Sequence, residues 1–150
     1  MSTKRPFGPS SPSQSRERKT NMVDYIALLK KEVCPAEGCT EPVAVAFAVS
    51  LAAEQLDVVP SSVNLKLSAN IIKNALGVGI PGTGMVGIEI AAALGAVIRQ
   101  SAKKLEVLQG FSAEQLDEAK AMVDAKIIRV EQKQTPEALY IEASVEADGQ

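Results

Sequence analysis

The segment VAVAFAVSLAA, residues 43–53, is apolar at almost every position. A helix that is apolar on all sides must be buried, either inside a domain or against a partner. The run is shorter than the roughly 20 residues that a membrane span needs. Residues 85–99 predict another helix of the same kind. Aromatic residues make up only 3% of the chain, so the core must consist mainly of Ala, Val, Ile and Leu.

The remaining segments indicate both helices and strands. Helical spacing of apolar residues marks residues 22–33 and 112–125, and residues 70–76 predict one or two helical turns. Alternation predicts strands at residues 62–68, 126–132 and 139–147. We therefore expect an α+β fold in which apolar helices pack on a small mixed or antiparallel sheet.

The two ends of the chain differ from its middle. Residues 1–21 are basic and rich in Ser and Pro, and predict a disordered tail ahead of a domain over residues 22–150. The last strand runs into Asp148-Gly149, a hairpin signal with no return strand after it. We expect the chain to be a fragment of a longer protein.

Composition excludes several classes of function. The chain has no histidine, which removes Ser-His-Asp triads, Cys-His pairs and the usual zinc sites. A net charge of −2 argues against a nucleic-acid partner. The basic tail has no apolar segment behind it, so it is no signal peptide. Two cysteines are too few for a disulfide framework. We expect a cytoplasmic protein without a membrane partner.

The motif Gly38-Cys39-Thr40-Glu41-Pro42 predicts the start of the first apolar helix, with Thr40 as its capping residue. Unpaired N–H groups and the helix dipole stabilise an anion at such a position. A Cys39 thiolate could act as a base, a nucleophile or a metal ligand. The alternative is a small apolar residue in a tight turn.

A second candidate group is polar. Asn70, Lys73 and Asn74 share one face if residues 70–76 are helical, and an ammonium with two amides suits a carboxylate or a phosphate. The alternative is an ordinary solvated helix face.

A glycine-rich loop, GVGIPGTGMVG, spans residues 77–87. Gly82-Thr83-Gly84 begins a match to the dinucleotide-binding pattern G-x-G-x-x-G, but the segment before it is a poor strand. A tight turn that presents N–H groups at a helix N-terminus is the better interpretation. Glu89 lies in the apolar helix that follows. An acid among apolar residues is either paired with another polar group, part of a binding site, or directed toward solvent.

In combination, GCTEPVAVAFA and NIIKNALGVGIPGTGMVGIEIAAALGA resemble the L-cysteine desulfidase family, which is related to the alpha chain of iron–sulfur L-serine dehydratases. The resemblance covers about residues 22–150 and only the N-terminal portion of that fold. It implies a pyridoxal-independent lyase that converts L-cysteine to pyruvate, ammonia and hydrogen sulfide with a [4Fe-4S] cluster. It also implies that Cys39 accepts the substrate's α-proton or, alternatively, binds the cluster.

The resemblance further implies a substrate pocket made from Asn70, Lys73, Asn74 and the turn Gly82-Thr83-Gly84. The family's cluster-binding cysteines lie in a C-terminal half that has no counterpart here. We therefore expect no cluster and no activity on this chain alone, and a C-terminal partner chain or a homo-oligomer. An L-serine dehydratase-type lyase and a non-catalytic interaction module or remnant are the alternatives.

Overall fold

The computed structural model describes residues 23–33 and 38–148, so the tail predicted for residues 1–21 lies outside the described residues. The chain divides into two units after Val33. The first contains helix α1 (Tyr25–Glu32), which is capped by Asp24. The Asp24 carboxylate accepts hydrogen bonds from the backbone N–H groups of Ile26 and Ala27. No residue of α1 is buried.

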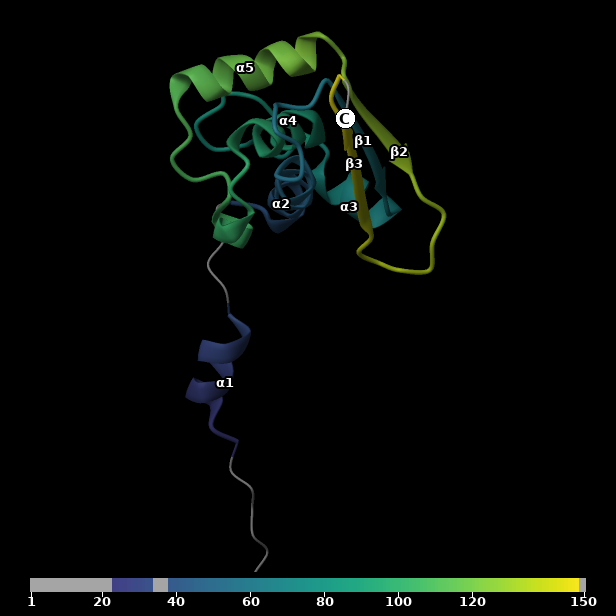
Figure 1. The fold of residues 1–150 in the computed structure, drawn as a ribbon. Coiled ribbons are helices and arrows are strands. Elements are labelled where there is room, and N and C mark those ends of the chain that lie inside the picture. Colours follow the sequence, from purple (N-terminus) through teal and green to yellow (C-terminus); the bar gives the residue numbers. More distant parts are fainter. Residues whose placement is uncertain (1–22, 34–37, 149–150) are drawn as a thin grey trace, which may run out of the picture. The chain divides into compact units, whose positions relative to one another are not determined.

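The second unit contains the remaining elements (Figure 1). Its helices are α2 (Thr40–Ala53), α3 (Ala69–Ala75), α4 (Ile88–Ile98) and α5 (Ala113–Asp124), with a 3-10 helix, η1 (Ser101–Glu106). Its strands are β1 (Ser62–Leu67), β2 (Ile128–Gln132) and β3 (Ile141–Glu146). Helices packed on a small sheet confirm the predicted α+β class.

The sheet is mixed, with the strand order β2-β1-β3. The central strand β1 pairs in parallel with β2 and antiparallel with β3. Val63, Leu65 and Leu67 of β1 are at most 1% exposed, which confirms the alternation predicted for this segment. This inner face packs against the helices, with α2 in contact with β3 and α4 in contact with β2.

Helices α2 and α4 form the centre of the core, as their apolar sequences predict. The two helices cross closely at Gly95, where an added Cβ would lie 2.3 Å from the carbonyl oxygen of Ala46. Every residue of α4 except Glu89 is buried. Within the described residues, no helix has the length and hydropathy needed to cross a membrane.

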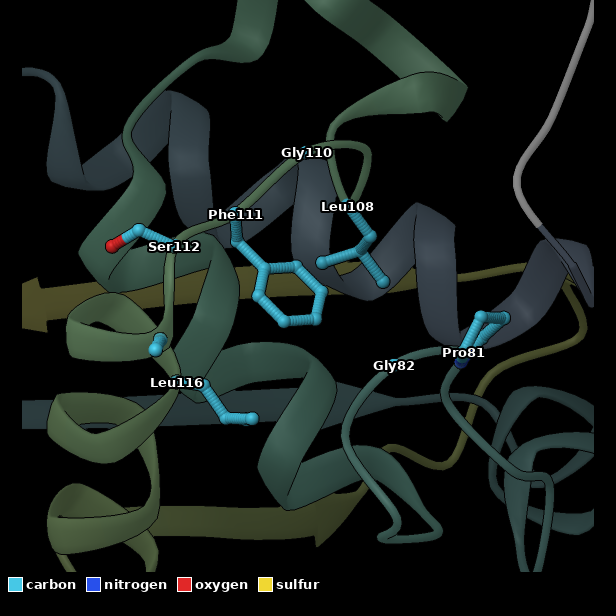
Figure 2. Close-up of a pocket in the computed structure, with 8 residues that line it drawn as sticks. Pro81, Gly82, Leu108, Gly110, Phe111, Ser112 and Leu116 are labelled. Carbon is cyan, nitrogen blue, oxygen red and sulfur yellow. The ribbon is translucent and has the colours of Figure 1, made fainter.

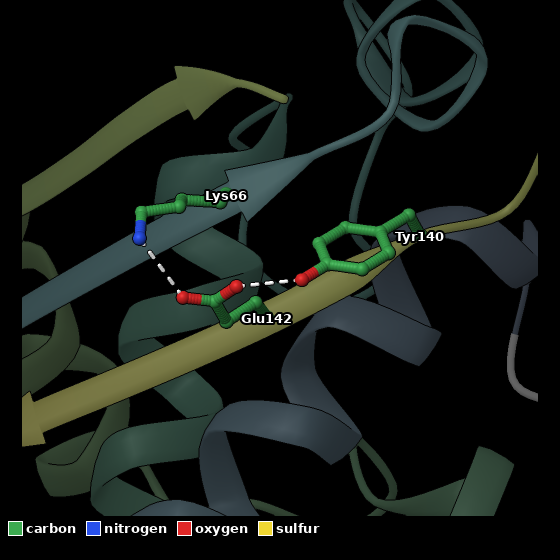
Figure 3. Close-up of polar contacts among 3 residues, drawn as sticks. All are labelled: Lys66, Tyr140 and Glu142. Atoms are coloured by element: carbon green, nitrogen blue, oxygen red, sulfur yellow. Dashed lines mark hydrogen bonds and ion pairs between the residues drawn. The ribbon is translucent and has the colours of Figure 1, made fainter. Parts of the chain in front are cut away.

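The outer face of the sheet is polar. Lys66 of β1 lies opposite Glu131 of β2 and Glu142 of β3. Figure 3 shows the resulting network: Lys66 Nζ donates to Glu142 Oε1 at 3.0 Å, and the Tyr140 hydroxyl donates to Glu142 Oε2 at 2.6 Å. Charges of alternating sign suit this face to contact with water.

Some element boundaries differ from the sequence-based predictions. Helix α2 has Cys39, not Thr40, at its N-cap position. Helix α4 begins at Ile88 rather than Met85, because Gly87 has a φ of 97°, outside the helical region. Strand β2 begins at Ile128 because Lys126 takes a left-handed conformation with a φ of 55°. The first residue of a helix or strand depends on the backbone dihedral angles of a single residue. The spacing of apolar residues does not predict these angles.

Candidate functional site

Cys39 lies at the N-terminus of the buried helix α2, with an exposed side chain. Its backbone is extended, with φ −70° and ψ 134°, so the chain turns into the helix directly after it. The thiol does not cap the helix. Instead, Cys39 Sγ donates a hydrogen bond to Glu41 Oε2 over 3.2 Å. The cysteine is therefore accessible to solvent and held by a carboxylate.

Glu41 is the residue that connects the site. Its carboxylate accepts hydrogen bonds from Cys39, from the Thr40 hydroxyl at 3.2 Å and from Asn74 Nδ2 at 3.0 Å. The bond from Cys39, followed by that from Asn74, lowers the pKa of Glu41 below its ordinary value. A carboxylate that stays ionised can hold both donors in place over the whole physiological pH range.

The sequence pattern marked Glu41 only as a member of the motif at residues 38–42 and did not indicate its part in the site. Spacing alone could not show the contact, because Asn74 lies 33 residues away on another helix. The available signal was the position of Glu41 itself, two residues after a cysteine at a helix start. A side chain there can reach back over the N-cap residue.

The turn before Cys39 lies against the glycine-rich loop. Gly38 has a φ of 79°, and a Cβ added there would be 3.5 Å from Cγ of Pro81. Two motifs that are some forty residues apart in the sequence, GCTEP and GIPGTG, are thus neighbours in the fold. This contact brings the two sequence motifs together, although neither Gly38 nor Pro81 is itself a predicted site residue.

A small apolar pocket of about 90 Å³ opens beside Glu41. Ala44 of α2, Ile71 of α3 and the exposed Leu139 line it, together with Thr40 and Glu41. Polar groups and a small apolar space therefore lie side by side next to Cys39. A ligand there could have a polar end and a short apolar or sulfur-bearing part.

The three polar residues predicted on α3 have different surroundings. Asn74 contacts Glu41, as described above. Asn70 lines a different pocket of about 230 Å³, which it shares with residues 132–138 before β3. The Lys73 side chain is exposed and has no hydrogen bond or ion pair with the described part of the chain. Of the three, Asn74 alone is shown in contact with the Cys39–Glu41 group.

The glycine turn has a structural role. Thr83 is 6% exposed, and its hydroxyl donates to the Ile80 carbonyl at 2.7 Å and accepts from the Met85 N–H at 2.9 Å. An isolated antiparallel bridge joins Gly79 to Val86. These contacts fix the turn and leave the Thr83 hydroxyl little capacity for a ligand.

The glycines on either side of Thr83 face different surroundings. Gly82 lines an apolar pocket of about 460 Å³, in which the ring of Phe111 lies close to it (Figure 2). Gly84 is exposed, with open space where a Cβ would stand. Neither is shown in contact with Cys39, so their predicted place in a substrate pocket stays a prediction.

The glycine-rich loop also lacks the flanking secondary structure of a dinucleotide-binding site. In such folds the glycine pattern connects a strand directly to a helix. Here the element before the loop is helix α3, and the described residues contribute only the Gly79–Val86 bridge between α3 and α4. The structure therefore supports a tight turn and not a Rossmann connection.

The donor set does not fit an iron–sulfur cluster on this chain. The described residues contain no group of three or more His, Cys, Asp or Glu side chains placed to hold a metal ion. The whole sequence supplies two cysteines and no histidine. A four-iron cluster requires three or four cysteine ligands, more than this sequence supplies.

In comparison with known proteins, the chain is similar to the UPF0597 proteins. The protein from Clostridium perfringens is 59% identical over 121 residues, which cover 81% of this chain and 28% of that protein. The one from Porphyromonas gingivalis is 56% identical over 123 residues, again 81% of this chain and 28% of the relative.

The relative from Phocaeicola vulgatus is 51% identical over 132 residues, or 87% of this chain and 31% of the relative. The chain thus spans less than a third of the length of these curated relatives. Their shared name states no activity, substrate or cofactor. No family model and no solved structure matches the chain.

Proposed function

We propose that this chain provides the thiol-bearing part of a pyridoxal-independent lyase of the L-cysteine desulfidase type. The observation that supports the proposal is the exposed Cys39 thiol at the start of α2, hydrogen-bonded to Glu41, which in turn holds Asn74. The family resemblance of the GCTEP and glycine-loop motifs, stated above, supplies the reaction.

The proposed reaction is an α,β-elimination. The Cys39 thiolate removes the proton from Cα of L-cysteine, and the electron pair forms a double bond to Cβ as hydrosulfide leaves. The resulting 2-aminoacrylate tautomerises to an imine, and water converts the imine to pyruvate and ammonia. The sum is L-cysteine plus water to pyruvate, ammonia and hydrogen sulfide. Glu41 and Asn74 would fix the thiol relative to the substrate.

Loss of hydrosulfide needs an electrophile near the leaving sulfur. In the family that the sequence resembles, a cluster has this role, and the described residues contain no group of side chains placed to hold a metal ion. We therefore propose that the chain is inactive alone. A separate chain equivalent to the part of the relatives beyond the matched segment would complete the site, and a homo-oligomer of this chain is the alternative.

The test is anaerobic reconstitution with iron and sulfide, with and without a complementing polypeptide. The complement is the segment of the Clostridium perfringens relative that follows the matched residues. We expect pyruvate and sulfide from L-cysteine only when both parts are present. Pyruvate from L-serine in preference to L-cysteine would select the serine dehydratase alternative.

The matched variants are Cys39→Ser and Cys34→Ser. Loss of a general base lowers the rate by about 100-fold or more, so Cys39→Ser should remove activity and Cys34→Ser should keep it. A four-iron cluster on this chain alone would contradict the predicted inactivity. A complex that carries a cluster but turns over neither amino acid would refute the lyase and leave a non-catalytic interaction module.

A further inference from the structure

A pocket of about 410 Å³ lies at the start of α4, and its lining residues differ from those of the Cys39 site. Met85, Val86, Glu89 and Ile90 line it from the end of the glycine-rich loop and the first turn of α4. Val123, Lys126 and Ile128 line it from the end of α5 and the start of β2. The proposed lyase chemistry does not involve this pocket.

The floor of the pocket is apolar and fixed. Ile90 and Ile128 are 0% and 9% exposed, and Met85 and Val123 pack against the same core. Val86 is 59% exposed at the pocket, although the bridge to Gly79 holds its backbone in place. The backbone bridge therefore holds the Val86 side chain in a solvent-exposed position beside the apolar floor of the pocket.

Two opposite charges flank this floor. Glu89 and Lys126 are both exposed, and neither side chain makes a hydrogen bond or an ion pair with the described residues. Each is held by its backbone: Glu89 by the first turn of α4, and Lys126 by a left-handed conformation with a φ of 55°. Glu89 Oε2 lies back over Gly87, 3.3 Å from where a Cβ would stand.

We propose that this pocket binds a free α-amino acid with an apolar side chain. Glu89 would accept the ammonium group, Lys126 would contact the carboxylate, and the side chain would cover Val86 and the apolar floor. The volume lies in the range of about 300–1,000 Å³ that is usual for small-molecule sites. A ligand with both charges and an apolar body satisfies all three features, whereas a simple anion or cation satisfies only one.

The binding test is a titration of the full chain with L-leucine, followed by backbone amide chemical shifts. We expect saturable shifts at Val86, Glu89 and Lys126 at millimolar concentrations. L-Serine lacks the apolar side chain, 4-methylpentanoate lacks the ammonium and 3-methylbutylamine lacks the carboxylate. Each should bind at least about tenfold more weakly, because each lacks one of the three contacts.

The variants Glu89→Gln and Lys126→Met should each weaken L-leucine binding by about tenfold or more. Glu118→Gln and Arg129→Met make the same charge changes at exposed positions outside the pocket and should leave binding unchanged. Unchanged melting temperatures would show that the variants fold. If one does not fold, the three analogues with the unmodified chain decide the question.

Three results would overturn the proposal: no saturable shift, binding by both pocket variants that is as strong as that of the unmodified chain, or shifts confined to the Phe111 pocket. Binding by Cys39→Ser should equal that of the unmodified chain, since Cys39 does not line this pocket. The L-leucine titration can therefore fail without any consequence for the proposed lyase, and the lyase experiment can fail without any consequence for this pocket.

Discussion

At the scale of single residues, the candidate site depends on one carboxylate. Glu41 lies between a thiol and an amide from different helices, and its three hydrogen bonds connect them. In the described geometry the Cys39 thiol donates to the Glu41 carboxylate, so a negatively charged group lies directly beside the sulfur.

Replacing Glu41 with Gln should make Cys39 react faster with iodoacetamide at neutral pH, by about a few-fold, because a negative neighbour no longer opposes the thiolate. Mass spectrometry of the Cys39 peptide measures the rate separately from Cys34. Glu32→Gln, an exposed acid in the separate N-terminal unit, is the matched control. An unchanged or slower rate in Glu41→Gln would show that the carboxylate does not restrain the thiol.

Gly95 is the residue on which the helix packing depends most directly. An alanine there would gain about 1 kcal/mol in helix propensity. Its Cβ would, however, lie 2.3 Å from the Ala46 carbonyl oxygen, and backbone cannot yield as a flexible side chain does. The clash should prevail, so Gly95→Ala should lower the free energy of unfolding by about 1–3 kcal/mol in urea denaturation.

Gly79→Ala is the control for this substitution. It has no atom within 4 Å of an added Cβ and no positive φ, and should change stability by less than about 1 kcal/mol. Equal free energies of unfolding for Gly95→Ala and Gly79→Ala would contradict this prediction. They would mean that α2 and α4 move apart at little cost to accept the added methyl group.

At the scale of elements, the two faces of the sheet have different roles. The inner face carries the buried aliphatic residues of β1, and the outer face carries the network of Lys66, Glu142 and Tyr140. Exposed ion pairs add little stability, so the network chiefly favours one pairing of β1 with β3. The bond from Tyr140, followed by that from Lys66, lowers the pKa of Glu142 from its ordinary value of 4.5.

This shift predicts a pH dependence with a definite sign. A carboxyl whose pKa is lower in the folded state stabilises the fold above its unfolded pKa, and this contribution is lost as the pH falls through the folded value. Glu142→Gln should therefore lower the melting temperature at neutral pH, and the difference from the unmodified chain should shrink below pH 4.5.

Glu146→Gln is the control for Glu142→Gln. It changes an exposed acid on the same strand whose side chain has no hydrogen bond or ion pair with the described residues. It should show no comparable trend in thermal melts between acidic and neutral pH. A constant difference for Glu142→Gln across that range would contradict the predicted role of the carboxylate.

At the scale of the whole molecule, the fold presents several exposed surfaces. The apolar side chains of α1 are exposed, as are Leu76 and Leu139 near the ends of α3 and β3. The matched relatives are more than three times as long as the segment they share with this chain. These observations support the proposal that a further polypeptide completes the catalytic site, which the reconstitution experiment tests.

The sequence alone determined the element types and the inner face of β1. Alternation and apolar runs record which side chains leave water, so they predict β1, α2 and α5 with boundaries correct to within a few residues. The same signal located Cys39 at a helix start. The roles of Asn70 and Lys73 were not determined in this way, since polar residues on one helix face need not share a partner.

Only the tertiary structure decided which residues meet. It brought Asn74 to Glu41 across 33 residues, set Gly38 against Pro81, and placed Glu89 and Lys126 at one pocket. It also gave β1 one parallel and one antiparallel neighbour. Local periodicity reports burial along one element, whereas contacts between elements follow from how the buried faces pack together, which no single segment encodes.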